Sequence, residues 1–329
     1  MAPRIGSLWD TVGNTPLLRI GSLSRLTGCE LLGKAEFMNP GGSIKDRAAK
    51  GMIRRGEEEG KLKPGSTIVE GTAGNTGIGL GLLGRERGYR VVVTMPDNLV
   101  REKYELLEAM GVEVHRVPAV PFSNPNHFFH RARVLAEEHG WFWANQFENT
   151  ANGDFHYETT GPEVWEQCEG RLDILVCSVG SGGTISGVSR YLKEKNPALR
   201  VVLVDPQGSG LYCYVREGKI EGTGSSITEG IGIMRLTENF RRAQVDEAMR
   251  LTDQDMLEML YHLAREDALV VGTSAAINAR AAYELARRHR GEGLRIVTFL
   301  NDHGSRYASR VFNPEFLSAK QLAVNPLPR

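Results

Sequence analysis

Short apolar runs alternate along the chain with longer stretches of helical pattern. Six of the runs have the length of buried strands, at positions 66–70, 90–95, 112–117, 173–179, 200–204 and 295–300. Strands that alternate with helices are typical of parallel sheets, because each return to the same edge needs a crossover. The pattern therefore predicts an α/β protein, and it contains no internal repeat of solenoid period.

The first glycine-rich turn follows the predicted strand 66–70. It reads Gly71-Thr72-Ala73-Gly74-Asn75-Thr76-Gly77, and the apolar stretch 78–83 predicts a helix after it. Glycines let a backbone approach a ligand closely, and the free amides of a helix start bind anions. The turn is therefore a candidate site for a carboxylate or a cofactor oxygen. Taken alone, the same glycines also suit a tight connection.

A second glycine turn follows the predicted strand 173–179. It reads Gly180-Ser181-Gly182-Gly183-Thr184 and opens a helix at Ile185. Successive amides at a helix N-terminus cradle a phosphate, and the two hydroxyls add donors. A dinucleotide-binding unit has a similar turn, but its G-x-G-x-x-G pattern fails here at Ile185. Because Asp205 closes the next strand as such a unit requires, a nicotinamide dehydrogenase stays open, whereas the P-loop sequence G-x-x-x-x-G-K-[ST] does not occur.

Lys45 stands in the run Asn39-Pro40-Gly41-Gly42-Ser43-Ile44-Lys45-Asp46-Arg47. A lone lysine that opens a helix is usually a solvated charge. In a site that lowers its proton affinity, however, a lysine amine forms an imine with a carbonyl compound, most often the cofactor pyridoxal phosphate. Together with two candidate ligand-binding turns, Lys45 is the candidate for that attachment. Its nearest competitors, Lys34 and Lys50, are expected to be surface charges.

In order and spacing, these motifs resemble the pyridoxal-phosphate enzymes of the cysteine synthase and cystathionine β-synthase family along nearly the whole chain. The matching segments are Gly13-Asn14-Thr15-Pro16-Leu17, Ser43-Ile44-Lys45-Asp46-Arg47, Thr72-Ala73-Gly74-Asn75-Thr76, Gln146-Phe147, Thr160-Gly161-Pro162-Glu163, Gly180-Ser181-Gly182-Gly183-Thr184 and Gly272-Thr273-Ser274. The resemblance implies fold type II, a two-domain α/β enzyme with parallel-rich sheets flanked by helices and the site in the interdomain cleft. The expected domains are a larger one of residues 1–35 and 146–312, a smaller mobile one of residues 36–145, and a tail of residues 313–329.

The resemblance also implies roles for individual residues. Lys45 is the catalytic lysine and carries the cofactor, pyridoxal 5'-phosphate. The other implied cofactor-binding residues are Asn75, Gly180, Ser181, Gly182, Gly183, Thr184 and Ser274, and the implied substrate-binding residues are Thr72, Ala73, Gly74, Asn75, Thr76, Gln146 and Gly230. Closure of the smaller domain on the substrate carboxylate would exclude water.

Ser274 lies where the family places the serine that meets the pyridine nitrogen. A neutral hydroxyl does not stabilise a protonated ring nitrogen as an aspartate would, so the ring is a weaker electron sink. This favours expulsion of a β leaving group over transamination. Without the resemblance, an ordinary helix-capping serine is the preferred interpretation of Ser274.

The implied reaction is β-replacement, in which O-acetyl-L-serine and sulfide give L-cysteine and acetate. Departures from the family pattern leave the acceptor open, and one of them is the segment Ile233-Met234-Arg235-Leu236, which is expected to line the acceptor side. Ala73 replaces a frequent serine, Ala276 replaces a usual glycine, and Glu229 stands where cysteine synthases tend to have glutamine and cystathionine β-synthases glutamate. The alternatives are thioether formation of the cystathionine β-synthase type, a cysteine β-lyase and, in another class, a ligand-sensing relative, against which the retained Lys45 argues.

Composition indicates the cellular compartment and the partners of the protein. The 329 residues carry 40 basic and 40 acidic side chains, so nothing favours a nucleic-acid partner. Four cysteines without C-x-x-C spacing indicate a reducing compartment, and eight histidines show no metal-ligand pattern. The first 20 residues lack the apolar core of a secretory signal, and no apolar stretch approaches the roughly 20 residues of a membrane span.

These observations lead to expectations about partners and the tail. We expect a cytoplasmic enzyme without a metal, with a small amino-acid substrate and a thiol or sulfide acceptor, and with no membrane partner; the resemblance adds a homodimer. The tail 313–329 is rich in proline, so we expect it to pack loosely or to contact a second subunit.

Overall fold

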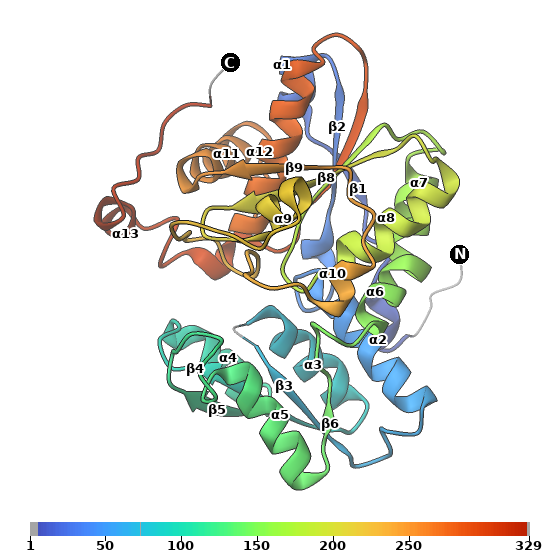
Figure 1. Cartoon of the computed structure of the whole chain (residues 1–329), viewed down its shortest axis with the longest axis vertical. Helices are drawn as coiled ribbons and strands as arrows, with labels where there is room; N and C mark the ends of the chain where they lie inside the picture. The colour runs from blue at the N-terminus through green and yellow to red at the C-terminus, as the bar shows by residue number, and fades with distance from the viewer. Residues whose placement is uncertain (1–5, 73, 328–329) are drawn as a thin grey trace.

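The structure is a computed structural model that describes residues 6–72 and 74–327. Two parallel-rich sheets, each flanked by helices, form an upper and a lower unit in Figure 1. This architecture confirms the α/β prediction, and each of the six predicted runs lies on a strand. Among the described helices, none is both long enough and apolar enough to cross a membrane.

The larger sheet has six strands in the order β1-β2-β10-β7-β8-β9. Strands β1 and β2 are antiparallel, and the other neighbours are parallel. The last strand in the sequence, β10, lies between β2 and β7 near the middle of the sheet. The bounds are β1 (Leu17–Arg19), β2 (Glu30–Lys34), β7 (Ile174–Ser178), β8 (Arg200–Pro206), β9 (Glu247–Leu251) and β10 (Arg295–Phe299).

The smaller sheet has four parallel strands in the order β5-β4-β3-β6. Its central strands β3 and β4 are buried on both faces, which explains their continuous apolar runs. The bounds are β3 (Thr67–Gly71), β4 (Arg90–Pro96), β5 (Glu113–Val117) and β6 (Phe142–Trp143).

Helices cover the sheets in both units (Figure 1). Those of the lower unit are α2 (Lys45–Glu58), α3 (Asn75–Glu86), α4 (Arg101–Ala109) and α5 (Phe128–His139). Those of the upper unit are α1 (Gly21–Thr27), α6 (Ala151–Phe155), α7 (Gly161–Gln167), α8 (Gly183–Lys195), α9 (Leu211–Glu217), α10 (Glu238–Arg241), α11 (Asp253–Glu266), α12 (Thr273–Arg288) and α13 (Pro314–Ala319). Shorter helical turns are η1 (Trp9–Thr11), η2 (Glu36–Met38), η3 (His156–Thr160) and η4 (Gly304–Tyr307).

Helix α12 is central to the core of the upper unit. Its buried face is rich in alanine, and small side chains let a helix lie close to the strands that it covers. Ala276, which departs from the family pattern, is fully buried in this face. The substitution therefore affects packing beneath the site and does not add a side chain to it.

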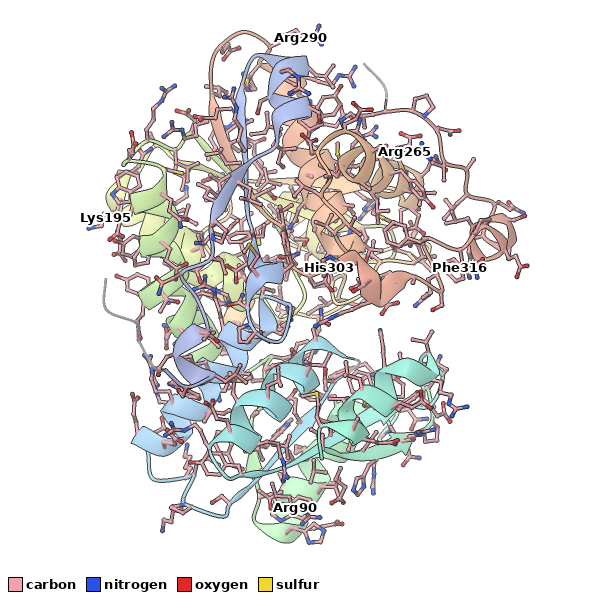
Figure 2. All side chains as sticks on the ribbon, turned by 180° about the vertical axis from the view of Figure 1, so that it is seen from behind. Arg90, Lys195, Arg265, Arg290, His303 and Phe316 are labelled. Atoms are coloured by element: carbon pink, nitrogen blue, oxygen red, sulfur yellow. The ribbon has the colours of Figure 1, made fainter. Side chains whose placement is uncertain are left out.

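The tail packs against the upper unit, so the alternative of a loosely packed tail was wrong, and contact with a second subunit stays a prediction. Leu317 of α13 and Leu327 are buried in the same apolar cluster as helices α11 and α12. Phe316, labelled in Figure 2, packs against that cluster. The apolar residues between the prolines bury enough surface to hold the tail in place.

The two sheets come from separate parts of the sequence. Strands of the smaller sheet fall within 67–143, and those of the larger sheet fall within 17–34 and 174–299. We therefore propose the domain limits expected from the sequence, 36–145 for the smaller domain and 1–35 with 146–312 for the larger one. The carboxyl ends of β3, β7 and β10 lead into loops that line one cavity between the two sheets.

Candidate active site

A cavity of about 530 Å³ lies between the two units. Its lining includes Lys45, the loop that begins at Thr72, the loop that begins at Gly180, and Ser274. In parallel α/β sheets, ligands bind at the carboxyl ends of strands, where loops from different crossovers meet. The fold thus brings together four segments that are far apart in the sequence. Ala73 lies outside the described residues.

Lys45 is the first residue of α2 and borders the cavity. Its backbone N–H donates to Ser43 Oγ (3.2 Å), so the preceding serine satisfies an amide at the helix start. No described residue hydrogen-bonds its Nζ in the structure. Burial lowers the pKa of Lys45, while the negative charge of Asp302 opposes that change. A lysine with a lowered pKa exists more often as the free amine, the form that attacks a carbonyl or accepts a proton.

The loop after β7 forms a tight cradle at the start of α8. Gly180 passes so close to the opposite loop that an added Cβ would lie 2.1 Å from the carbonyl oxygen of Gly230. Ser181 Oγ accepts a hydrogen bond from Asn152 Nδ2 (2.9 Å), which fixes the hydroxyl. The first amides of α8 are free of intrahelical partners, as phosphate binding requires. Gly183, the first residue of α8, borders Asn152 and is absent from the described cavity lining.

His156 is a site residue that the sequence gave no reason to select. Its Nε2 lies 3.2 Å from Thr184 Oγ1 and its Nδ1 lies 2.8 Å from Thr160 Oγ1. Burial, and then the charges of Arg47 and Lys45, hold the pKa of His156 well below its ordinary value, so the ring is neutral. His156 therefore orients the Thr184 hydroxyl behind the loop without adding a charge. The family-like segment Thr160 to Glu163 lies beside it, but gave no signal for a histidine.

Ser274 lies in the first turn of α12, with its hydroxyl at the cavity. Its Oγ accepts a hydrogen bond from Asn301 Nδ2 (3.0 Å), and Asn301 follows β10. Because the oxygen already accepts, the hydroxyl proton remains for donation to a neutral acceptor. This arrangement agrees with the expected partner, an unprotonated ring nitrogen.

In the loop after β3, most polar groups bond to one another. Gly74 N donates to Thr72 Oγ1 (3.1 Å), and Thr76 Oγ1 donates to Gln146 Oε1 (2.7 Å). Gln146 is buried, and its Nε2 donates to Glu70 Oε1 (3.1 Å). Burial raises the pKa of Glu70 to about 8. The structure thus places Gln146 as a support beneath Thr76, and we propose that it acts on the substrate through this contact.

The cavity lining also contains a carboxylate, Glu229, and a group of aromatic side chains. Glu229 is bonded by Lys103 of α4 and by Arg310, so both of its carboxylate oxygens are occupied. The guanidinium of Arg235 lies 4.8 to 5.0 Å from the ring centres of Phe122, Phe129 and Phe147. Cation–π contacts of this kind join the loop of the larger unit to the smaller unit. No sequence pattern pointed to these aromatic residues, because their spacing is irregular.

Lys34 is fully buried, so the prediction of a surface charge was wrong. Its Nζ lies 2.7 Å from Glu163 Oε2 and donates to the carbonyl oxygen of Thr15 (2.5 Å). Glu163 lies in α7, more than one hundred residues further along the chain. The ion pair between Lys34 and Glu163 could therefore not be predicted from the local sequence. Lys50 is half-buried and donates to the carbonyl oxygen of Trp9 (2.8 Å).

The described residues fit pyridoxal phosphate. The cavity offers an unbonded lysine amine, a glycine cradle at a helix start and a serine with a free proton. In addition, Ser178 Oγ at the end of β7 is buried without a hydrogen-bond partner in the structure, and it lines the same cavity. A buried polar atom of this kind is usually satisfied by a bound group. Together, the fold and the site define a fold-type-II pyridoxal-phosphate enzyme.

Comparison with known proteins leads to the same class of enzyme. The family model described as pyridoxal-phosphate dependent enzyme matches residues 8–302, and the chain belongs to this family. Cysteine synthase 1 of Neurospora crassa is 48% identical over 96% of this chain and 85% of that protein. The cysteine synthase of Dictyostelium discoideum is 48% identical over 97% of this chain and 87% of its own length. The solved structure of O-ureido-L-serine synthase matches with a TM-score of 0.87 and 34% identity, over 95% of this chain and 96% of that one.

Removal of the Thr184 hydroxyl should weaken cofactor retention. A hydrogen bond to a charged phosphate is worth about 1.5 to 3 kcal/mol, so the Kd for pyridoxal phosphate should rise about 10- to 100-fold in Thr184→Ala. Equilibrium dialysis measures the Kd of each variant for pyridoxal phosphate. Ser186→Ala on the same helix is the matched control, because Ser186 Oγ is buried without a partner in the structure. Equal retention by both variants would show that the cradle is structural.

Proposed function

We propose that the protein is a cysteine synthase, which replaces the acetate of O-acetyl-L-serine by sulfide to give L-cysteine. The observation that carries the proposal is the Lys45 amine facing a cavity that also holds the Ser274 hydroxyl and the glycine cradle. The similarity to the cysteine synthases over nearly the whole chain supports the same activity. With this family established, a nicotinamide dehydrogenase is no longer an alternative.

The residues divide the work of the reaction. The glycine cradle with Ser181 and Thr184 holds the phosphate, and Ser274 meets the ring. The loop of Thr72 to Thr76 binds the substrate carboxylate through amides of the helix start and the Thr72 hydroxyl, because the Thr76 hydroxyl already donates to Gln146. Pyridoxal phosphate, when bound, withdraws electrons from the amino-acid Cα and makes its proton acidic.

Lys45 is the base of this site. Its amine takes the proton from Cα, and the released electron pair expels the β-substituent with its bonding electrons. Lys103 is the other lysine in the described cavity lining, and its amine is bonded to Glu229. The wall formed by Arg235 and Phe122 lies at the cavity, where closure of the two units would keep water from the reacting atoms.

Thioether formation is the second candidate, and Glu229 is the residue that favours it. A longer acceptor such as homocysteine carries an ammonium that a carboxylate in the wall would bind. In this structure, however, Lys103 and Arg310 already occupy the Glu229 oxygens. Displacing two cations to bind a third gains little, so the arrangement favours the small acceptor, sulfide.

A substrate panel tests the proposal. O-acetylserine with sulfide should give cysteine faster than serine with homocysteine gives the thioether, measured by mass spectrometry. Glu229→Gln is the matched variant: for a cysteine synthase, the sulfide reaction should persist in it. A faster homocysteine reaction in the parent that is lost in Glu229→Gln would replace the proposal by thioether formation. Pyruvate and ammonia without either product would indicate a lyase, and no product from any amino acid would favour a ligand-sensing protein.

The cellular location and the oligomeric state of the protein are also part of the proposal. Three of the four cysteines are buried and all four are unpaired in the structure, which supports a cytoplasmic location. The family resemblance supports a homodimer, whose mass sedimentation equilibrium would measure.

A further inference from the structure

Asp302 lies at the point where the segments of the site meet. It follows β10 and pairs with Ser43 in an isolated bridge, next to the hydrogen bond from Ile44 N to the carbonyl oxygen of Asn301 (2.8 Å). Its own carbonyl oxygen accepts from the N–H of Gly272, just before α12. Figure 2 labels the next residue, His303, at the boundary between the upper and lower units. Asp302 is thus tied to the loop of Lys45 and to the helix start of Ser274.

The carboxylate of Asp302 is almost completely buried, with 1% of the residue exposed. Its Oδ2 accepts from Tyr307 Oη (2.6 Å) and from Asn75 Nδ2 (2.8 Å). Its Oδ1 is buried without a partner among the described residues. Gly272 makes room for this oxygen, since an added Cβ would lie 2.1 Å from it. A buried carboxylate with an unused oxygen is costly to the fold, so a structural role alone explains it poorly.

Asn75 belongs to the smaller unit and is held at both ends of its side-chain amide. Its Nδ2 donates to Asp302, while its Oδ1 accepts from Arg306, which also bonds the carbonyl oxygen of Gly41. A carboxylate only accepts and a guanidinium only donates, so these two neighbours decide which way the amide faces. The second Nδ2 hydrogen remains available to a ligand.

Asp302 also interacts electrostatically with Lys45. Burial raises the pKa of Asp302, while Tyr307, Asn75, Arg306 and Lys45 favour its ionised form. In return, the negative charge of Asp302 raises the pKa of Lys45 against the effect of burial. The other titratable groups that bear on this cluster are Cys177 and His156, near Lys45, and Glu229, near Tyr307.

We infer that Asp302 is a positioning residue of the reaction: it orients Asn75 across the cavity and stabilises the positive charge that Lys45 acquires. The inference rests on the proposed function. When the Cα–H bond breaks, the proton forms a new N–H bond on Lys45, and the electron pair left on the substrate breaks the bond to the leaving acetate. The ammonium formed at Lys45 then has the Asp302 carboxylate as its counter-charge, and no other reactant is needed.

The test replaces the carboxylate by an amide of the same shape, in the enzyme loaded with pyridoxal phosphate. Without substrate, the visible absorbance of the cofactor attached to Lys45 is titrated with alkali, which removes the proton of the linkage nitrogen. Asp302→Asn should lower the midpoint by about one pH unit, because a negative charge that favours the proton is lost. With substrate, kcat should fall about tenfold or more, while KM changes less.

Asp205→Asn is the matched control. Asp205 is also buried at the carboxyl end of a parallel strand, has a raised pKa from burial and has an unpartnered Oδ1, but it is outside the described cavity lining. The Asp205→Asn variant should therefore have the same titration midpoint and kcat as the parent. If Asp302→Asn does not fold, Asp302→Ser removes the same negative charge and should lower the midpoint in the same direction.

A midpoint and kcat in Asp302→Asn equal to those of the parent would overturn the inference, as would an unchanged midpoint in Asp302→Ser if that variant has to be used. An equal shift in Asp205→Asn would also overturn it, since the effect would then belong to any buried carboxylate. The absorbance titration uses no amino acid, so it does not depend on which substrate the enzyme takes. Failure of the parent to make cysteine would therefore reject the proposed function and leave this measurement intact.

Discussion

Lys45→Ala should lose turnover and the visible absorbance of attached pyridoxal phosphate. The variant removes both the amine that holds the cofactor and the base that takes the Cα proton, and the loss of a general base alone costs about 10²–10⁴-fold in rate. In the described cavity lining, the remaining lysine is Lys103, whose amine is bonded to Glu229. The absorbance spectrum after gel filtration and the rate of cysteine formation measure the two losses.

Lys50→Ala is the control for this variant. Lys50 lies further along the same helix, α2, and its amine donates to Trp9, away from the cavity. Its spectrum and rate should match those of the parent. Normal absorbance and activity in Lys45→Ala would show that another lysine carries the cofactor.

Arg47→Met should destabilise the fold by about 3–5 kcal/mol, because it leaves the buried carboxylate of Glu36 without its cation. It also removes one of the two cations that pair with Glu163. Arg47 is fully buried and makes two hydrogen bonds with Glu36 (2.7 and 2.9 Å) and two with Glu163 (both 2.7 Å). The midpoint of urea unfolding measures the loss. Arg54→Met on the same helix is the control: its partner Glu158 is exposed, and such pairs contribute about 0–1 kcal/mol.

The loss of stability in Arg47→Met should depend on pH in a defined direction. Burial alone would raise the pKa of Glu163, but Arg47 and Lys34 hold it at about 2. A carboxyl with a lowered folded-state pKa contributes stability above its unfolded pKa of 4.5, and this contribution disappears as the pH falls toward 2. The difference between the parent and Arg47→Met should therefore be largest at neutral pH and shrink below about pH 4. A difference that is constant from pH 7 to 3 would contradict this account.

Features that depend on local sequence could be predicted. Most of the apolar runs could be located because their strands are buried on both faces, as β3, β4, β7, β8 and β10 are. The glycine turns could be located because only glycine allows the close approach seen at Gly180. The cavity collects Lys45, Ser274 and both turns because parallel strands end at a common edge. Ordered motifs were thus sufficient to locate the candidate site.

Features that depend on pairing between distant residues could not be predicted. Lys34 is a buried cation because Glu163 lies beside it, and no local pattern announces that contact. The same holds for His156 behind Thr184 and for Asp302 opposite Asn75, where the partners are 28 and 227 residues apart. A single histidine or aspartate carries no periodic signal, so its role emerges only when the fold has placed its partner.

The position of β10 has a consequence for the order in which the protein can mature. Strand β10 lies between β2 and β7, so the antiparallel pair of β1 and β2 cannot join the rest of the larger sheet until residues 295–299 have left the ribosome. Asn301 and Asp302, which hold Ser274 and Asn75, are synthesised later still. Domains usually fold as units during synthesis, but here β1 and β2 must wait for β10. Binding of pyridoxal phosphate is therefore a late event, and it reports that the chain has been made as far as Asp302.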